Sequence, residues 1–166
     1  MITIKAAKQT DAMEIRSLLC KVWQDTFEGV LPEKTVTEVP LKAYDYKLLK
    51  SQLEDPAVKF LVAKDSTGKI IGVTNAKQQN EVIYINRLYI DRAYQRMGLG
   101  NAFINELIKQ FPLAEKVVLE VVEKNAKGIS FYLKNGFMVT GKNKSKIGDH
   151  VLDVLVLQKN LEQGSF

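Results

Sequence analysis

The hexapeptide Gln95-Arg96-Met97-Gly98-Leu99-Gly100 decides the fold class, because it lies between a predicted strand and a predicted amphipathic helix. Residues 82–90 are predicted to form the strand. Residues 98–111 are predicted to form the helix, since apolar residues recur every four positions, at Leu99, Phe103, Leu107 and Phe111. Glycines in such a turn let the backbone approach a ligand closely. Free N–H groups at the start of a helix attract anions, so this loop is a candidate site for a diphosphate.

Two common phosphate-binding motifs fit this loop poorly. A Walker A loop continues with Lys and then Ser or Thr, whereas Gly100 is followed by Asn101 and Ala102. A Rossmann fingerprint needs a third glycine, where this chain has Phe103, and its first glycine closely follows the strand. Seven residues separate Ile90 from Gly98, so the Rossmann interpretation is weak.

Outward from this loop, strand and helix patterns alternate along the whole chain. Thr10 is the predicted N-cap of a first helix, which Gly29 and Pro32 close, and residues 31–40 show little pattern. Residues 116–122 are apolar on both faces, as in a central parallel strand. Asn125 is a predicted cap for a helix that Asn135-Gly136 ends. The remaining predicted elements are a helix at 41–53 and strands at 2–7, 60–63, 70–76, 137–140 and 151–157. One α/β domain with a mixed sheet is the economical arrangement.

The composition is that of a globular protein of ordinary charge. Of the 166 residues 46% are hydrophobic and 26% are charged, and no apolar run approaches a membrane span. A single cysteine, Cys20, excludes an internal disulfide framework and is typical of a reducing cytoplasm. The net charge of +5 comes without zinc-finger or RNA-binding motifs, so no nucleic-acid partner is expected. No metal site is expected either, because no group of residues has metal-ligand spacing.

Two motifs in the correct order resemble those of GNAT acetyltransferases. The loop 95–100 matches the family's Gln/Arg-x-x-Gly-x-Gly/Ala pattern, and Asn86-Arg87-Leu88-Tyr89-Ile90 precedes it as the family's central strand does. Downstream, Glu120-Val121-Val122-Glu123-Lys124-Asn125 and then Phe131-Tyr132-Leu133-Lys134-Asn135-Gly136-Phe137 resemble the second motif. The resemblance implies an acetyl-coenzyme A-dependent N-acetyltransferase formed by a single domain, residues 1–166. It also implies a mostly antiparallel sheet, with a central parallel pair that separates at the cofactor site and helices on both faces.

The resemblance further implies which residues hold the cofactor. The backbone of Leu88, Tyr89 and Ile90 would contact pantetheine. The diphosphate would bind at Gln95, Arg96, Met97, Gly98, Leu99 and Gly100. Asn125 and Lys134 would reach the cofactor from the second motif, although Asn125 is equally well explained as a helix cap.

For catalysis, Tyr132 matches the tyrosine that protonates the leaving thiolate in this family, although a core aromatic is the competing interpretation. The acceptor amine must lose a proton before it attacks, because the pKa of a lysine-like amine is about 10.4. Many relatives carry glutamates for this step at positions matching Tyr84 and Asn86, and neither is acidic here. Glu120 and Glu81 are the candidate bases, acting through water. The alternative is that no dedicated base is used.

The amine that would accept the acetyl group is the feature that the sequence specifies least. Trp23-Gln24-Asp25-Thr26-Phe27 together with Lys146-Ile147-Gly148-Asp149 is similar to bacterial polyamine-type (spermidine/spermine) GNATs. Four acidic residues could attract a polycation or be plain surface: Glu28, Glu33, Glu38 and Asp45. His150 is a weak candidate for lining the acceptor site. A peptide or protein amine, a non-catalytic acyl-coenzyme A sensor and a nucleic-acid-binding module are the alternatives, and a homodimer is left open.

Overall fold

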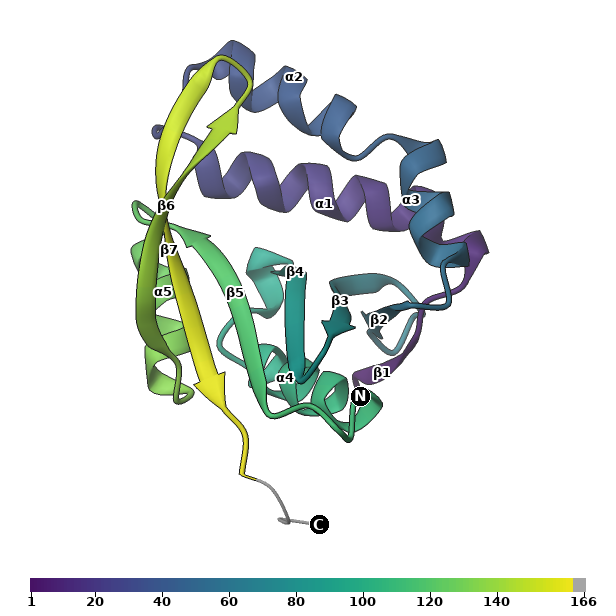
Figure 1. The fold of residues 1–166 in the computed structure, drawn as a ribbon. Coiled ribbons are helices and arrows are strands. Elements are labelled where there is room, and N and C mark those ends of the chain that lie inside the picture. The colour runs from purple at the N-terminus through teal and green to yellow at the C-terminus, as the bar shows by residue number, and fades with distance from the viewer. Residues whose placement is uncertain (163–166) are drawn as a thin grey trace.

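A seven-stranded sheet organises the protein in the computed structural model, which describes residues 1–162 (Figure 1). The strand order is β1-β2-β3-β4-β5-β7-β6. The strands are β1 Thr3–Ala6, β2 Val58–Lys64, β3 Ile70–Gln79, β4 Val82–Ile90, β5 Lys116–Val122, β6 Met138–Ile147 and β7 His150–Asn160. The helices are α1 Ala12–Phe27, α2 Glu33–Ala43, α3 Tyr46–Glu54, α4 Leu99–Gln110 and α5 Ala126–Lys134, with short 3₁₀ turns η1 Gln9–Asp11 and η2 Arg92–Tyr94.

The single parallel pair, β4 and β5, separates along its length. Every other neighbouring pair is antiparallel. β4 pairs with β5 only from Val82 to Tyr84 on one strand and from Lys116 to Val118 on the other. Figure 1 shows the two strands diverging towards α1 beyond that point. The predicted sheet with a splayed central pair is therefore confirmed.

A β-bulge helps to bend β4 where the separation begins. Asn75 of β3 faces Arg87, whereas the next residue, Ala76, faces Ile85, so Asn86 is the extra residue of the bulge. A bulge bends a strand and increases its twist. Ile85 before the bulge and Leu88 after it both pack on the α4 side of the sheet, so the bulge preserves the buried face while the strand changes direction.

Two hydrophobic clusters cover the two faces of the sheet. On one face α4 and α5 contribute Phe103, Leu107 and Tyr132 to the first cluster. On the other face α1 and α3 contribute Ile15, Leu19 and Leu49 to the second cluster. Each cluster contains fully buried aliphatic side chains, so the sheet is stabilised from both sides.

The region between α1 and β2 differs from the prediction. Helix α2, residues 33–43, covers most of the segment 31–40 that shows little pattern and also the first three residues of the predicted helix at 41–53. The rest of that predicted helix forms α3, after a break at Tyr44 and Asp45. Pro40 misled the prediction of where this helix ends, because proline usually breaks a helix, whereas here it lies inside α2 and is buried. Asp45 starts α3 as an N-cap, since its side chain accepts hydrogen bonds from the N–H groups of Lys47 and Leu48. Thr10 is not the N-cap of α1, because it lies within η1.

The hairpin of β6 and β7 is longer than predicted and reaches α2. Its turn passes close to that helix, because a Cβ atom placed on Gly148 would lie 3.1 Å from Val39 Cγ2 and 3.5 Å from Thr35 Cγ2. Figure 1 shows the hairpin tip beside α2. The hairpin and α2 therefore enclose the α1 side of the sheet. Within residues 1–162, no helix combines the length and hydrophobicity needed to cross a membrane.

Candidate functional site

The opening between β4 and β5 leaves two strand edges without strand partners. β4 remains paired with β3 as far as Ile90, and β5 remains paired with β7 as far as Val122. Their facing edges have no ladder beyond Tyr84 and Val118. Buried N–H and C=O groups need hydrogen-bond partners, so an extended ligand that carries amide groups fits this opening. Leu88, Tyr89 and Ile90 all lie on the separated part of β4.

The loop from η2 to α4 leaves the start of that helix without a side-chain cap. Gly98 is the N-cap of α4 with φ +81°, and its helix start has no side-chain cap. Arg96 also has a positive φ, +62°, which is uncommon for a residue with a side chain. The side chains of Gln95, Arg96 and Met97 are exposed, while Leu99 is buried in the core and offers only its backbone. These features leave the first N–H groups of α4 available to a phosphate.

Gly100 has a packing role that the sequence did not indicate. A Cβ atom at this position would lie 2.6 Å from Phe131 Cζ, a distance at which one of the two groups must move. Gly100 therefore allows α4 to lie against the ring of Phe131 on α5. At Gly98, by contrast, a Cβ atom would meet nothing within 4 Å.

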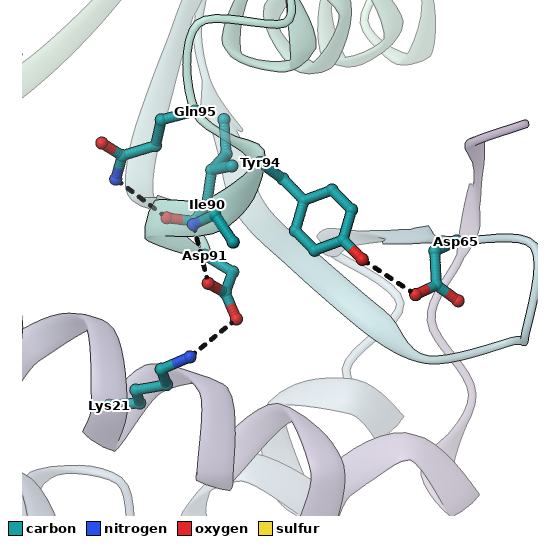
Figure 2. A network of polar contacts seen from close by, with 7 residues as sticks. Lys21, Asp65, Ile90, Asp91, Tyr94 and Gln95 are labelled. Carbon is teal, nitrogen blue, oxygen red and sulfur yellow. Dashed lines mark hydrogen bonds and ion pairs between the residues drawn. The ribbon is translucent and has the colours of Figure 1, made fainter.

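A polar network around Asp91 holds the start of the loop in place (Figure 2). The buried Asp91 carboxylate accepts hydrogen bonds from Ala93 N and from Lys21 Nζ of α1, both at 3.0 Å. Asp91 N donates to Ile71 O at 2.8 Å, so the network also includes β3. Gln95 Nε2 donates to Ile90 O and Tyr94 Oη donates to Asp65 Oδ2. Sequence reasoning missed Asp91, although an Asp after a strand and two residues before an unpaired N–H is a common local cap.

Asp91→Asn is expected to destabilise the protein at neutral pH by about 1 kcal/mol, a fall of roughly 2–4 °C in Tm. Burial alone would raise the pKa of Asp91, but the Ala93 amide and the Lys21 ammonium group outweigh burial and lower that pKa below its ordinary value. A lowered pKa in the folded state stabilises the protein above the pKa of the unfolded chain, about 3.9, and this stabilisation is lost as the pH falls through the folded value. The difference in Tm should therefore disappear in acid.

Thermal unfolding across pH 2.5–7 measures this difference, with Asp25→Asn on the exposed face of α1 as the matched control. Equal Tm values for the Asp91 variant and the unmodified protein throughout that range would contradict the assignment.

The second motif contributes a capped helix and a hollow. Asn125 Oδ1 accepts from Gly128 N at 3.1 Å, so the cap predicted for α5 is present. Lys134 lies at the other end of α5 and is exposed. A hollow on this helix is lined by Glu123, Ala126, Ile129, Ser130, Leu133 and Lys134.

Tyr132 is almost fully buried, with 9% of its surface exposed. Its ring packs edge-on against Phe131 and Phe137, with centroid distances of 5.1 and 5.4 Å. Burial, and then the neighbouring charge of Tyr89, raises the pKa of the Tyr132 phenol well above its ordinary value. A phenol in this environment stays protonated at neutral pH, so its hydrogen is present to be donated.

The two candidate bases lie at opposite ends of the parallel pair. Glu120 is exposed on the separated part of β5, and its Oε1 accepts a hydrogen bond from Asn143 Nδ2 at 3.2 Å. Glu81 precedes β4, where its carbonyl accepts from Glu115 N. Because a strand rises about 3.3 Å per residue, Glu81 lies roughly 20 Å from Leu88. Glu120 thus lies on the separated part of β5 with its carboxylate directed across β7 to Asn143 of β6, whereas Glu81 lies at the paired end of the two strands.

The aromatic residues that resemble polyamine-type enzymes are structural in this chain. Trp23 and Phe27 are buried in the α1-side cluster, with ring centroids 4.5 Å apart. Glu28, Glu33 and Glu38 are exposed at the end of α1 and on α2, whereas Asp45 caps α3. His150 starts β7 and pairs with Ile147 at the hairpin turn.

Comparison with known proteins identifies the family. Residues 17–137 match the model of the acetyltransferase (GNAT) family, so the chain belongs to that family. A probable N-acetyltransferase of Mycobacterium tuberculosis is 27% identical over 145 residues, which cover 85% of this chain and 82% of the relative.

Two solved structures share the fold. The PaiA N-acetyltransferase of Thermoplasma acidophilum, solved in complex with coenzyme A, has a TM-score of 0.85 at 22% identity, covering 97% of this chain and 99% of that one. The spermidine N-acetyltransferase of Vibrio cholerae, solved with coenzyme A and spermine, has a TM-score of 0.73 at 19% identity, covering 98% and 96%.

Proposed function

We propose that the protein transfers the acetyl group of acetyl-coenzyme A to a primary amine by direct attack within a ternary complex. The observation that carries this proposal is the loss of pairing between β4 and β5 beyond Tyr84 and Val118, followed by a glycine loop at the start of α4. The family membership supports the same chemistry.

The residues at the opening fit the donor. Pantetheine is an extended chain with two amide groups, which can pair with the backbone of Leu88, Tyr89 and Ile90. The loop from Gln95 to Gly100 would hold the diphosphate, with Gly98 allowing close approach because its Cβ position is open. Asn125 and Lys134 would contact the donor from α5. Bound at this opening, the donor supplies a thioester that an amine can attack.

Two side chains of this chain would move protons. Glu120 would take the first proton, from the ammonium form of the acceptor, since an amine of pKa about 10.4 is charged at neutral pH. Tyr132 would donate a proton to the departing sulfur, and its burial keeps the phenol protonated for this step. Both residues are placed by the second motif and its strand.

Polyamines are the proposed acceptor class. Glu33 and Glu38 are exposed on α2, which covers the α1 side of the sheet, and Glu120 is exposed on β5, so these carboxylates offer negative charge to a polycation. The spermine complex of the Vibrio cholerae enzyme, which has the same fold, supports this choice. Thiol release from acetyl-coenzyme A, measured with spermidine, spermine, amino acids, aminoglycosides and short peptides, tests it. Turnover with peptides alone would show that peptide amines, and not polyamines, are the acceptors. Binding of acetyl-coenzyme A without any thiol release would indicate a sensor.

Glu120→Gln is expected to lower kcat about tenfold at pH 7 and progressively less as the pH approaches that of amine deprotonation, because the free amine then no longer needs a proton acceptor. Glu81→Gln is the matched control, since the same change at the far end of β4 should leave kcat unaltered. Steady-state rates between pH 6.5 and 10 measure both variants. Equal losses in the two variants would remove Glu120 from the mechanism.

A further inference from the structure

Four polar side chains form a cluster on the α1 side of the opening: Tyr44, Gln52, Arg87 and Tyr89. Tyr44 Oη donates a long hydrogen bond of 3.5 Å to Tyr89 Oη. Arg87 Nη1 donates to Gln52 Oε1 at 2.5 Å, and its guanidinium carbon lies 5.3 Å from the centre of the Tyr44 ring. The cluster thus joins β4 to α3 and to the connection between α2 and α3.

The charge of Arg87 has no carboxylate partner within residues 1–162 at ion-pair distance. Burial lowers the pKa of Arg87, and the two phenols of Tyr44 and Tyr89 oppose that effect. A partly buried cation without a counter-ion is costly. Negative charge that develops on either phenol would therefore be stabilised by Arg87.

Tyr89 also affects the pKa of a residue on the other face of the sheet. It packs with the cluster beneath α1, whereas Tyr132 belongs to the cluster beneath α4 and α5. The charge of Tyr89 nevertheless raises the pKa of Tyr132, so the two phenols lie within electrostatic reach. The sheet between the two clusters is interrupted where β4 leaves β5. Tyr44 and Tyr89 therefore lie on one side of the opening, joined by a hydrogen bond, and Tyr132 lies on the other side.

We propose that Tyr89 is a catalytic residue whose phenol oxygen accepts the second proton of the acceptor nitrogen and passes a proton to Tyr132. This inference rests on the proposed function. A hydroxyl group both accepts and donates, so it can serve both parts of the transfer. Because Tyr44 donates to Tyr89 Oη, the hydrogen of Tyr89 itself is free to be donated elsewhere.

The proton balance closes without another reactant. The bond between the amine nitrogen and the acyl carbon forms, and the nitrogen loses a proton to Tyr89 Oη. The carbon–sulfur bond breaks, and the sulfur takes the proton of Tyr132 Oη. The transfers at Tyr89 are concerted: as its oxygen takes the proton of the nitrogen, its own hydrogen passes to Tyr132, directly or through one water, so that no protonated phenol forms and both phenols are restored.

The ionisable groups that surround Tyr89 are compatible with this role. Tyr44 faces it from the α2–α3 connection, Arg87 from its own strand and Tyr132 from α5. Cys20 of α1 lies next to Tyr44, and Arg16 of the same helix donates to Tyr44 O at 2.8 Å.

The test is Tyr89→Phe, compared with Tyr46→Phe on the exposed start of α3. Tyr89→Phe should lower kcat roughly 10²-fold with the affinity for acetyl-coenzyme A unchanged, because the backbone contacts remain. Added imidazole should restore part of the lost turnover, since it can carry the proton through the opening. A residue that only fills space would not be rescued in this way. Tyr46→Phe should behave as the unmodified protein.

A Tyr89→Phe variant with unaltered kcat would overturn the inference alone, provided that the unmodified protein releases thiol. A loss that imidazole does not restore, or a loss confined to acetyl-coenzyme A affinity, would overturn it equally. Absence of thiol release from the unmodified protein with every acceptor would overturn the proposed function, and this inference with it.

Discussion

Tyr132→Phe is expected to lower kcat by roughly 10²–10³-fold while the affinity for acetyl-coenzyme A stays within about twofold of the original. The phenol is the proposed proton donor to the departing sulfur, and a phenyl ring cannot replace it. The fold should tolerate the change, because a Phe ring keeps the edge-on contacts with Phe131 and Phe137. A loss in kcat without a loss in binding is the pattern of an interaction made only during the chemical step.

The pH dependence adds a second check on Tyr132. Because the pKa of this phenol is raised, the protonated form persists through neutral and mildly alkaline pH. Activity of the unmodified protein should therefore not decline below about pH 10 through loss of this acid. Single-turnover rates and calorimetry separate chemistry from binding, with Tyr46→Phe as the control. Full turnover in Tyr132→Phe would leave Tyr132 as a core aromatic.

Gly98→Val is expected to weaken acetyl-coenzyme A binding by roughly 10–100-fold, because a β-branched residue is strained at φ +81° and would displace the start of α4 from the diphosphate. Gly68→Val is the matched control. Gly68 has φ +89° and equally open surroundings, but it lies in the turn between β2 and β3. Both variants should lose similar stability, and only Gly98→Val should lose affinity. Equal affinities by calorimetry would remove the loop from the binding site.

Gly100→Val tests the neighbouring position, where the expected effect is on folding. The added side chain would meet the Phe131 ring, and overpacking of this kind costs about 1–3 kcal/mol. Phe131→Leu combined with Gly100→Val should recover part of the lost stability, because the shorter side chain makes room. Additive losses in the double variant would contradict the contact.

Local patterns carried most of the correct predictions. The loop 95–100, the helix after it and the Asn125 cap depend on neighbouring residues, so the sequence indicated them directly. α2 was missed because Pro40 resembles a helix breaker, and its acceptance there depends on burial against other elements. The length of β6 was underestimated, because a charged edge strand has no buried face to reveal its period.

The residues of the candidate site also differ in whether local sequence could reveal them. The proposed cofactor residues follow from two contiguous motifs, which the structure places at the opening and on α5. Glu120 and Glu81 could not be separated by sequence, since the distinction depends on which end of the parallel pair comes apart. The roles proposed for Tyr44, Tyr89 and Tyr132 were hidden for a further reason: the three residues are far apart in the sequence and lie on two faces of the sheet.

The short pairing between β4 and β5 affects how the two parts of the sheet are held together. Within the sheet, three residue pairs join a four-stranded part, β1 to β4, to a three-stranded part formed by β5, β7 and β6. Beyond these pairs the two parts are held together by the hydrophobic clusters on the two faces and not by a strand ladder. A ligand that hydrogen-bonds to both strand edges would replace the missing backbone pairing, so coenzyme A and its acetylated form would both stabilise the domain against unfolding. Substitutions in the three paired positions should therefore change how strongly a bound donor stabilises the domain, which thermal unfolding with and without coenzyme A measures.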